Sequence, residues 1–111
     1  MPITVKKREV FFYKNNRGVE PVRAYLNKLK DRAGRAKIQQ KIVKASLGNF
    51  GQEGKGYRHI ERDVWELKVD FGPGYRVYFK IEEDQIILLL MAGTKKTQQD
   101  DITKALKYSG D

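Results

Sequence analysis

The chain has 111 residues, of which 40% are hydrophobic and 33% charged, and its formal net charge is +9. This length predicts one domain over residues 1–111. No window approaches the ~18 consecutive apolar residues that a membrane-spanning helix needs, no apolar segment follows the basic residues near the start, and cysteine is absent. We therefore expect no membrane span, no secretory signal and no disulfide or thiolate metal site, and a cytoplasmic location is the simplest expectation.

The positive charge is concentrated in the first half of the chain. Residues 1–50 carry 13 Lys and Arg against 3 Asp and Glu, whereas residues 51–111 carry 10 against 11. A basic surface attracts nucleic acid through counterion release, although an acidic protein would be attracted equally well. If the protein binds a polyanion, the first half is expected to face it.

The first elements in chain order are a strand and two helices. The aromatic and β-branched run Val10–Tyr13 predicts a strand, which a turn at 15–18 ends. From Pro21 the chain predicts an amphipathic helix, because four apolar residues follow at i, i+3, i+4 and i+7: Val22, Tyr25, Leu26 and Leu29.

A second helix is predicted from about Gly34 to Gly48, so the two helices form a basic helical hairpin. Its inward stripe is Ile38, Ile42 and Ala45. Its other face repeats lysines at i, i+4 and i+7, namely Lys37, Lys41 and Lys44. Such a stripe is usually a solvated helix face, but within this basic segment an RNA-binding surface is about equally favoured.

The second half is predicted to be mostly extended, with one closing helix. A glycine-rich loop at 48–56 precedes predicted strands at 57–60, 64–70, 75–81 and 86–92, and a helix at 97–108. Residues 71–74 read Phe-Gly-Pro-Gly and predict the turn of a hairpin. The strand at 86–92 is apolar without alternation, which is typical of a central strand covered on both faces.

Strand alternation assigns side chains to the two faces of the predicted hairpin. Trp65, Leu67 and Val69 share one parity, so burial of Trp65 is favoured over a role in base stacking. The other parity contains Glu66 together with four residues that would form an open cationic sheet face: Lys68, Arg76, Tyr78 and Lys80. The alternative is a solvated face with cross-strand ion pairs such as Glu66 with Arg76.

RNA cleavage without a metal needs a base for the 2′-hydroxyl, cations for the phosphate and an acid for the leaving oxygen. Lys, Arg and Tyr side chains can supply all three roles. His59 is the one histidine and no motif surrounds it, so neither a metal site nor a role for His59 in catalysis is favoured.

The stretch from Trp65 to Phe79, WELKVDFGPGYRVYF, resembles the core of the phage-derived, HigB-like killer proteins of addiction modules, which belong to the RelE/ParE superfamily. The likeness extends over residues 25–38, 46–51 and 88–102. It implies an α+β fold in which an N-terminal strand and the helical hairpin pack on a twisted, mainly antiparallel sheet, with a C-terminal helix. It also implies a toxin of a type II toxin–antitoxin system that cleaves mRNA on the ribosome and needs no cofactor. The implied partner is a helix-turn-helix antitoxin, through which alone operator DNA would be bound.

The resemblance suggests roles for individual residues. Arg76 matches the arginine that contacts the scissile phosphate, and Lys95 and Lys96 match a basic pair that supports phosphate binding and leaving-group chemistry. Lys68 stands where the family usually has Arg. Tyr78 or Lys95 are candidates for the acid and base, while Lys37, Lys41, Lys44 and Lys80 are candidates for RNA or ribosome binding.

Two departures keep other functions open. Glu66 and Val64 stand where RelE itself presents lysines, so the general base and acid are unassigned. The alternatives are a ParE-like inhibitor of DNA gyrase without nuclease chemistry, since one fold hosts both activities, and a catalytically decayed module that still binds its antitoxin.

Overall fold

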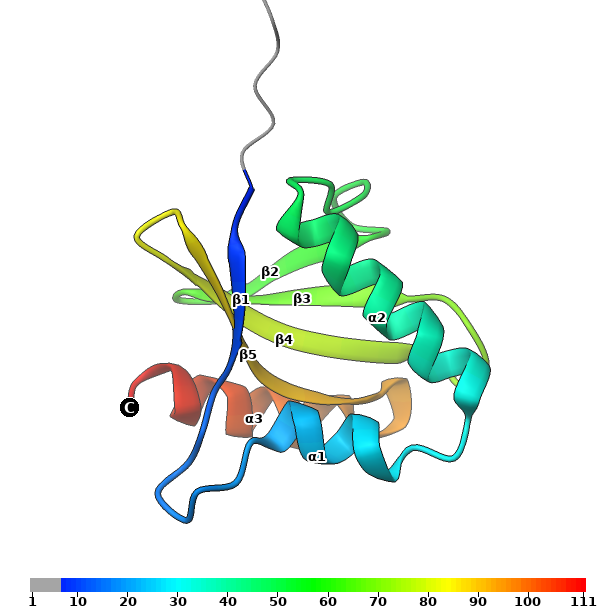
Figure 1. The fold of residues 1–111 in the computed structure, drawn as a ribbon, viewed down its shortest axis with the longest axis horizontal. Helices are drawn as coiled ribbons and strands as arrows, with labels where there is room; N and C mark the ends of the chain where they lie inside the picture. Colours follow the sequence, from blue (N-terminus) through cyan, green and yellow to red (C-terminus); the bar gives the residue numbers. More distant parts are fainter. Residues whose placement is uncertain (1–6) are drawn as a thin grey trace, which may run out of the picture.

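A five-stranded sheet forms the centre of the protein in the computed structural model, which describes residues 7–111 (Figure 1). Its strands lie in the order β1-β5-β4-β3-β2, where β1 pairs in parallel with β5 and all other pairs are antiparallel. The elements are β1 (Glu9–Phe12), α1 (Pro21–Lys28), α2 (Arg32–Ser46), β2 (Tyr57–Glu61), β3 (Val64–Val69), β4 (Tyr75–Glu82), β5 (Ile86–Thr94), the 3₁₀ turn η1 (Lys95–Thr97) and α3 (Gln98–Ser109). The predicted α+β fold is confirmed. Over the described residues, no helix is both long and apolar enough to cross a membrane.

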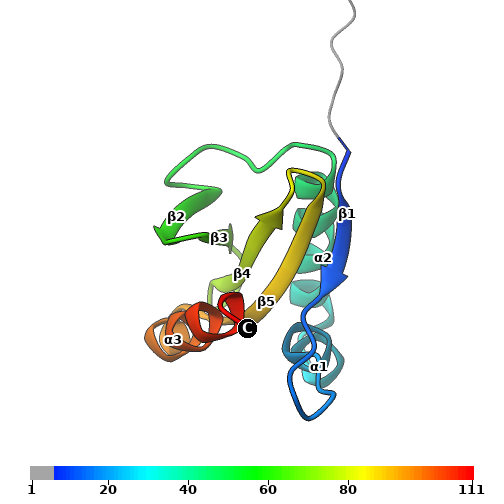
Figure 2. The same ribbon diagram turned by 90° about the vertical axis from the view of Figure 1, so that its left-hand side faces the viewer.

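Helices α1 and α2 cover one face of the sheet (Figures 1 and 2). Helix α1 lies over β5, and α2 lies over β3 and β4. The predicted stripes point inward and form the main core with the sheet: Val22, Leu26, Ile38, Ile42, Ala45, Leu67, Val69, Val77, Phe79, Ile87 and Leu89. Trp65 packs half-buried against this cluster, which confirms its predicted parity.

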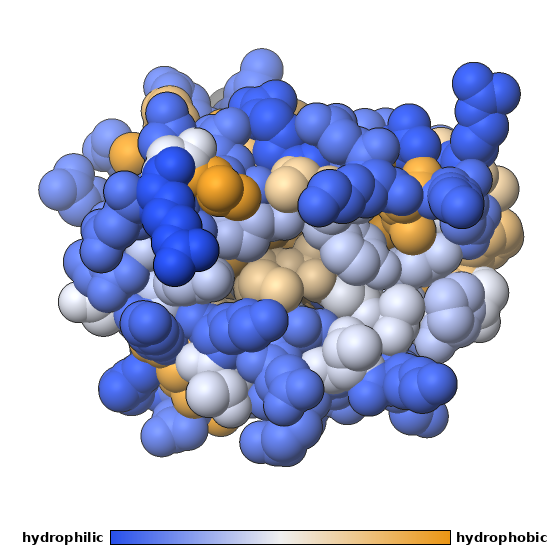
Figure 3. Space-filling view, turned by 90° about the horizontal axis from the view of Figure 1, so that it is seen from below, coloured by the Kyte–Doolittle hydropathy of each residue, from blue (hydrophilic) through white to orange (hydrophobic). Residues whose placement is uncertain are grey.

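The opposite face is covered by α3, so the prediction of an open cationic face was wrong (Figure 2). The apolar side of α3 has to be buried against something, and this face of the sheet was the one left free by α1 and α2. The result is a second core cluster of Val64, Tyr78, Leu90 and Ala105. From below, where α1 and α3 face the viewer, the surface is mostly hydrophilic with small apolar spots, because both helices turn their apolar sides inward (Figure 3).

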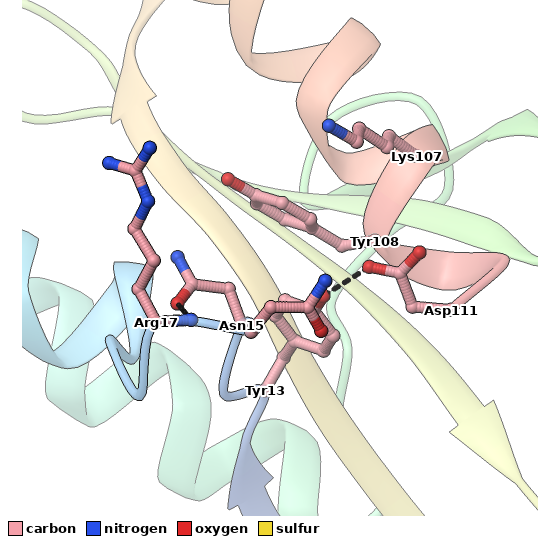
Figure 4. Close-up of a pocket in the computed structure, with 7 residues that line it drawn as sticks. Tyr13, Asn15, Arg17, Lys107, Tyr108 and Asp111 are labelled. Carbon is pink, nitrogen blue, oxygen red and sulfur yellow. Dashed lines mark hydrogen bonds between the residues drawn. The ribbon is translucent and has the colours of Figure 1, made fainter.

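The C-terminal end of α3 is tied to the segment after β1 (Figure 4). The ring of Tyr13 stacks on that of Tyr108, with centroids 4.7 Å apart, and the Tyr13 hydroxyl donates to the Asp111 carboxylate. This hydrogen bond, together with burial, raises the pKa of Tyr13 to about 12. The stacked pair lines a hollow of about 330 Å³ beside Arg17 and Lys107. Tyr13 therefore helps to hold the C-terminal end of α3 in place.

A hydrogen-bonded tether joins α2 to the turn between β3 and β4. Asp31 caps α2 by accepting from the Gly34 N–H at 2.9 Å, and it accepts from the Tyr75 hydroxyl at 2.6 Å. These two hydrogen bonds, that from Tyr75 first, hold the pKa of Asp31 below its usual range. Burial and the bond to Asp31 raise the pKa of Tyr75 to about 12. Because Asp31 is the cap, α2 begins at Arg32, two residues before the predicted start.

Gly34 lets α2 approach Tyr75 closely. A Cβ on this residue would lie 2.6 Å from Cε2 of Tyr75, too close for any real contact. We expect Gly34→Ala to lower the free energy of unfolding by roughly 1–3 kcal/mol through overpacking, even though alanine is the better helix former. Urea denaturation measures this change. The exposed Gln39→Ala on the same helix is the control, and a Gly34→Ala protein as stable as the wild type would contradict the close packing.

Candidate functional site

The turn between β3 and β4 brings Arg76 and Lys95 together. The two residues are far apart in sequence, but Arg76 on β4 pairs with Gly93 on β5, and η1 begins directly after β5. The Lys95 N–H donates to the Gly74 carbonyl at 2.8 Å, and a Cβ on Gly74 would lie 3.4 Å from Arg76 Nη1 and 3.6 Å from Lys95 Cβ. They line a hollow of about 360 Å³ with Asp70, Phe71, Gly72, Pro73 and Gly74. Two cations predicted to act on phosphate thus share one cavity.

A second hollow of about 230 Å³ adjoins the first. It is lined by Lys37, Gln40, Lys41, Lys44, Lys68, Val69, Asp70 and Phe71. Asp70 and Phe71 line both hollows, so the two hollows are neighbours at this turn. We call the combined surface the cationic trough: Lys37, Lys41, Lys44 and Lys68 at one end, Asp70 and Phe71 in the middle, Arg76 and Lys95 at the other end.

The lysine end of the trough is crowded with positive charge. Partial burial lowers the pKa of Lys41, the charge of nearby Lys44 lowers it further, and the Asp70 carboxylate opposes both. Lys37 Nζ lies 5.9 Å from the centroid of the Phe71 ring, within range of a cation–π interaction. An anionic ligand at this end would relieve the repulsion between the lysines.

The remaining predicted site residues lie elsewhere. Lys68 Nζ donates to the Gly54 carbonyl at 3.0 Å, at the lysine end of the trough and not beside Arg76, its neighbour across the sheet. Lys96 is exposed on η1 but does not line the hollow. Lys80 is 13% exposed and its Nζ donates to the Ser109 carbonyl at 3.0 Å, which stabilises the end of α3.

Tyr78 is fully buried under α3. Burial first, and then the negative charge of Glu66, raises the pKa of Tyr78 well above its usual range. The phenol therefore stays protonated at neutral pH, and it has no exposed surface through which to touch a substrate. A role of Tyr78 as acid or base remains a prediction, and the geometry gives it no support.

Behind Arg76 lies a buried carboxylate, Glu66, with no exposed surface. It accepts from Arg58 Nε at 2.8 Å and from Gln98 Nε2 at 2.8 Å, and Arg76 Nε lies 3.9 Å away. Burial opposes ionisation, yet the hydrogen bonds from Arg58 and Gln98 hold the pKa of Glu66 below its usual range. The cross-strand ion pair of Glu66 with Arg76 that the sequence suggested is thus present, but at 3.9 Å. Arg58, at 2.8 Å, is the arginine that hydrogen-bonds directly to Glu66.

Arg76 itself is held by the chain around it. Its side chain is 8% exposed, and Nη1 donates to the Tyr75 carbonyl at 3.0 Å. Its Nε is buried without a hydrogen-bond partner. The negative charge of Glu66, 3.9 Å from Nε, therefore compensates the guanidinium of Arg76, a residue that also lines the hollow.

Sequence analysis missed a second buried carboxylate, Asp101 on α3. It accepts from the Thr97 hydroxyl at 2.6 Å, and burial raises its pKa. Asp101 packs against Gly93, which is the β5 residue paired with Arg76. A Cβ added to Gly93 would lie 2.7 Å from Thr97 Oγ1 and would overlap the Asp101 carboxylate. The signal for this contact was a glycine inside an apolar strand, which often marks a close approach.

His59 has no catalytic setting. It is exposed, its Nε2 lies 2.6 Å from the Arg62 carbonyl oxygen, and its ring packs against Trp65 with centroids 4.9 Å apart. Among the residues that the structure describes, no three His, Asp or Glu side chains are grouped so as to hold a metal ion.

Comparison with known proteins shows the family of the chain. Residues 24–108 match the model of the family described as "Phage derived protein Gp49-like (DUF891)". The chain is also 38% identical over 82 residues to an uncharacterized protein of Haemophilus influenzae (strain ATCC 51907 / DSM 11121 / KW20 / Rd), covering 74% of this chain and 79% of that protein. The chain therefore belongs to the Gp49-like phage-derived family, a family of the toxin–antitoxin type.

The buried position of Glu66 predicts a defined pH dependence of stability. Glu66→Gln removes the negative charge between Arg58 and Arg76, and we expect it to lower the free energy of unfolding by about 3 kcal/mol. This value is the lower end of the range for breaking a buried ion pair, and we choose it because the Arg58 side chain is 41% exposed. The pKa of Glu66 is lower in the folded protein than in the unfolded chain. Its charge therefore stabilises the fold fully at pH values above the unfolded pKa of about 4.3, and this stabilisation is lost as the pH falls through the folded pKa.

The difference between wild type and Glu66→Gln should thus be constant near neutral pH and shrink below about pH 4. Urea denaturation at a series of pH values measures it. Glu61→Gln, an exposed position on β2, is the matched control and should change little. A difference that grows in acid would show that folding raises the pKa of Glu66, the opposite of the direction stated above.

Proposed function

We propose that this protein is the toxin of a type II toxin–antitoxin system and acts as a metal-independent mRNA endoribonuclease on the ribosome. The observation that supports the proposal is the convergence of Arg76 and Lys95 on one hollow at the end of the cationic trough. Membership of the Gp49-like family supports the coarser part, a protein of a toxin–antitoxin system.

The chemistry would use the substrate's own nucleophile. The 2′-oxygen attacks the adjacent phosphorus, the bond from phosphorus to the 5′-oxygen breaks, and the products carry a 2′,3′-cyclic phosphate and a 5′-hydroxyl. Negative charge grows on the phosphate oxygens during this step, and cations placed beside them lower the barrier. In this proposal the Arg76 guanidinium binds the phosphate and Lys95 supplies a second point charge, while Lys96, which does not line the hollow, has no assigned contact.

The lysine end of the trough supports RNA as the substrate. Three lysines on α2 and Lys68 line a hollow that shares Asp70 and Phe71 with the Arg76 hollow. A strand bound there would leave its next phosphates at Arg76 and Lys95. Contacts with phosphate fix the register of a strand without reading its sequence.

The proposed partners follow from the same function. An antitoxin with a helix-turn-helix domain would hold the toxin silent and alone contact operator DNA, while the ribosome and its mRNA would be the target. All of these are proposals for a cytoplasmic site of action.

The decisive experiment is induced expression in a bacterial host with mapping of RNA ends. We expect growth arrest and new cuts inside translated codons for the wild type, a loss of cuts by at least roughly 100-fold for Arg76→Ala, and a smaller loss for Lys95→Ala. Because Arg76 is buried, thermal unfolding must show that its variant folds; the exposed Lys95 provides the second test. Lys28→Ala, an exposed lysine outside the trough, is the control and should cleave normally.

Other outcomes of this experiment support the alternative functions. Growth arrest with intact mRNA and damaged or stalled chromosomes would favour inhibition of DNA gyrase. The absence of any arrest by a folded, expressed protein would favour a module that has lost its chemistry.

A salt titration tests whether the trough binds RNA. Each phosphate neutralised on a single strand contributes about 0.7 to the slope of log binding constant against log salt concentration. Replacing Lys37, Lys41 and Lys44 by alanine should therefore reduce the slope by about 2. The control replaces Lys7, Lys14 and Lys28, exposed lysines outside the trough, and an equal reduction in both variants would mean that the trough has no special role.

A further inference from the structure

We propose that Phe71 and Asp70 form a nucleobase subsite in the middle of the cationic trough, where one base of a single-stranded RNA stacks on the Phe71 ring and donates an amino hydrogen bond to Asp70. This inference rests on the proposed binding of RNA. It adds the position at which one base is bound and the kinds of base that fit there. Phosphates lie on either side of the subsite, on the lysines and on Arg76 with Lys95.

The position of Phe71 is the first argument. Phe71 is half-buried, lines both hollows and packs against the main core, and its ring centroid lies 5.9 Å from Lys37 Nζ. A ligand that passes from the lysines of α2 to Arg76 therefore meets this ring. Among the residues lining the two hollows, Phe71 is the one aromatic side chain, so it is the platform on which a base can stack.

The rigidity of the turn is the second argument. The Phe71 N–H donates to the Val69 carbonyl at 2.9 Å, and the Phe71 carbonyl accepts from the Gly74 N–H at 3.0 Å. The neighbouring tether from Tyr75 to Asp31 fixes the same turn to α2. A ring that is already held in place loses little conformational freedom when a base stacks on it.

The charge of Asp70 is the third argument, because it divides the trough. A carboxylate repels phosphate, and Asp70 is exposed beside Phe71 and close enough to Lys41 to oppose the lowering of the pKa of that lysine. Phosphates are therefore favoured at the two cationic ends and disfavoured in the middle. An uncharged base fits the middle, where the carboxylate accepts from an exocyclic amino group.

The same carboxylate predicts which bases fit. Adenine, cytosine and guanine carry exocyclic amino groups that can donate to a carboxylate, whereas uracil has none and its one edge donor, N3–H, lies between two carbonyl oxygens that a carboxylate repels. Sequence-specific binding to RNA generally targets unpaired bases, whose edges are free. The ligand class is thus single-stranded RNA with an amino-bearing base at this subsite.

Fluorescence of 2-aminopurine tests the stacking. A short single-stranded RNA containing one 2-aminopurine should lose fluorescence when it binds the wild-type protein at low salt, because stacking on an aromatic ring quenches this base. Phe71→Leu keeps the apolar packing but removes the ring, and we expect it to abolish the quenching and weaken binding about tenfold. Phe71→Tyr should retain both, and thermal unfolding of each variant checks that the core is intact.

Oligomers of a single base test the role of Asp70. The wild type should bind a cytosine hexamer more tightly than a uracil hexamer, by about tenfold. Asp70→Asn should remove most of this difference, because the amide can donate to a uracil carbonyl. Glu53→Gln, an exposed carboxylate outside the two hollows, should preserve the difference.

The outcomes separate this subsite from the proposed function. If Phe71→Leu binds as the wild type does while the lysine triple variant binds weakly, the strand uses the trough without stacking on Phe71, and the subsite is wrong. Failure of the wild type to bind free RNA at low salt would also overturn it. The proposed nuclease activity is judged independently, by the RNA ends formed in cells.

Discussion

The carboxylate of Glu66 is the charge on which the second face of the sheet depends. Once α3 covers this face, every polar side chain that points toward it has to find a partner without water. Glu66 satisfies Arg58 and Gln98 and lies 3.9 Å from Arg76, so residues of β2, β3, β4 and α3 share one centre of charge. Without this carboxylate, the buried guanidinium of Arg76 would lose the negative charge 3.9 Å away, and the partly exposed Arg58 would lose its close partner.

This arrangement links stability to the proposed chemistry. A buried arginine keeps a fixed position only if its charge is compensated, and a fixed position is what binding a phosphate in a defined geometry requires. On the opposite face, the hydrogen bonds of Asp31 hold α2 against the turn that carries Phe71 and Gly74. The two ends of the cationic trough are thus each attached to a different layer of the fold, and the turn between β3 and β4 connects them.

Much of the architecture could be predicted from local patterns, because the driving forces are local. Val22 and Leu26, or Ile38 and Ile42, recur at helical spacing, and Trp65, Leu67 and Val69 alternate, so the elements and their buried sides follow from periodicity. The apolar run of β5 indicated a strand covered on both faces, and Leu89 and Leu90 do lie in separate clusters. The error was to treat the face carrying Tyr78 as open when β5 and α3 already indicated a cover for it.

The sequence by itself determined the α+β composition, the uneven charge, the turn at residues 71–74 and the choice of Arg76 and Lys95 as candidate residues. Only the tertiary structure decided that Lys68 joins the lysines of α2, that Lys80 stabilises the end of α3, and that Phe71 lies between the two groups of cations. The physical reason is that periodicity specifies which side of its own element a residue occupies, whereas the neighbour on that side is set by how distant elements pack. A contact such as that of Asp101 with Gly93 therefore exists only after α3 has docked on the sheet.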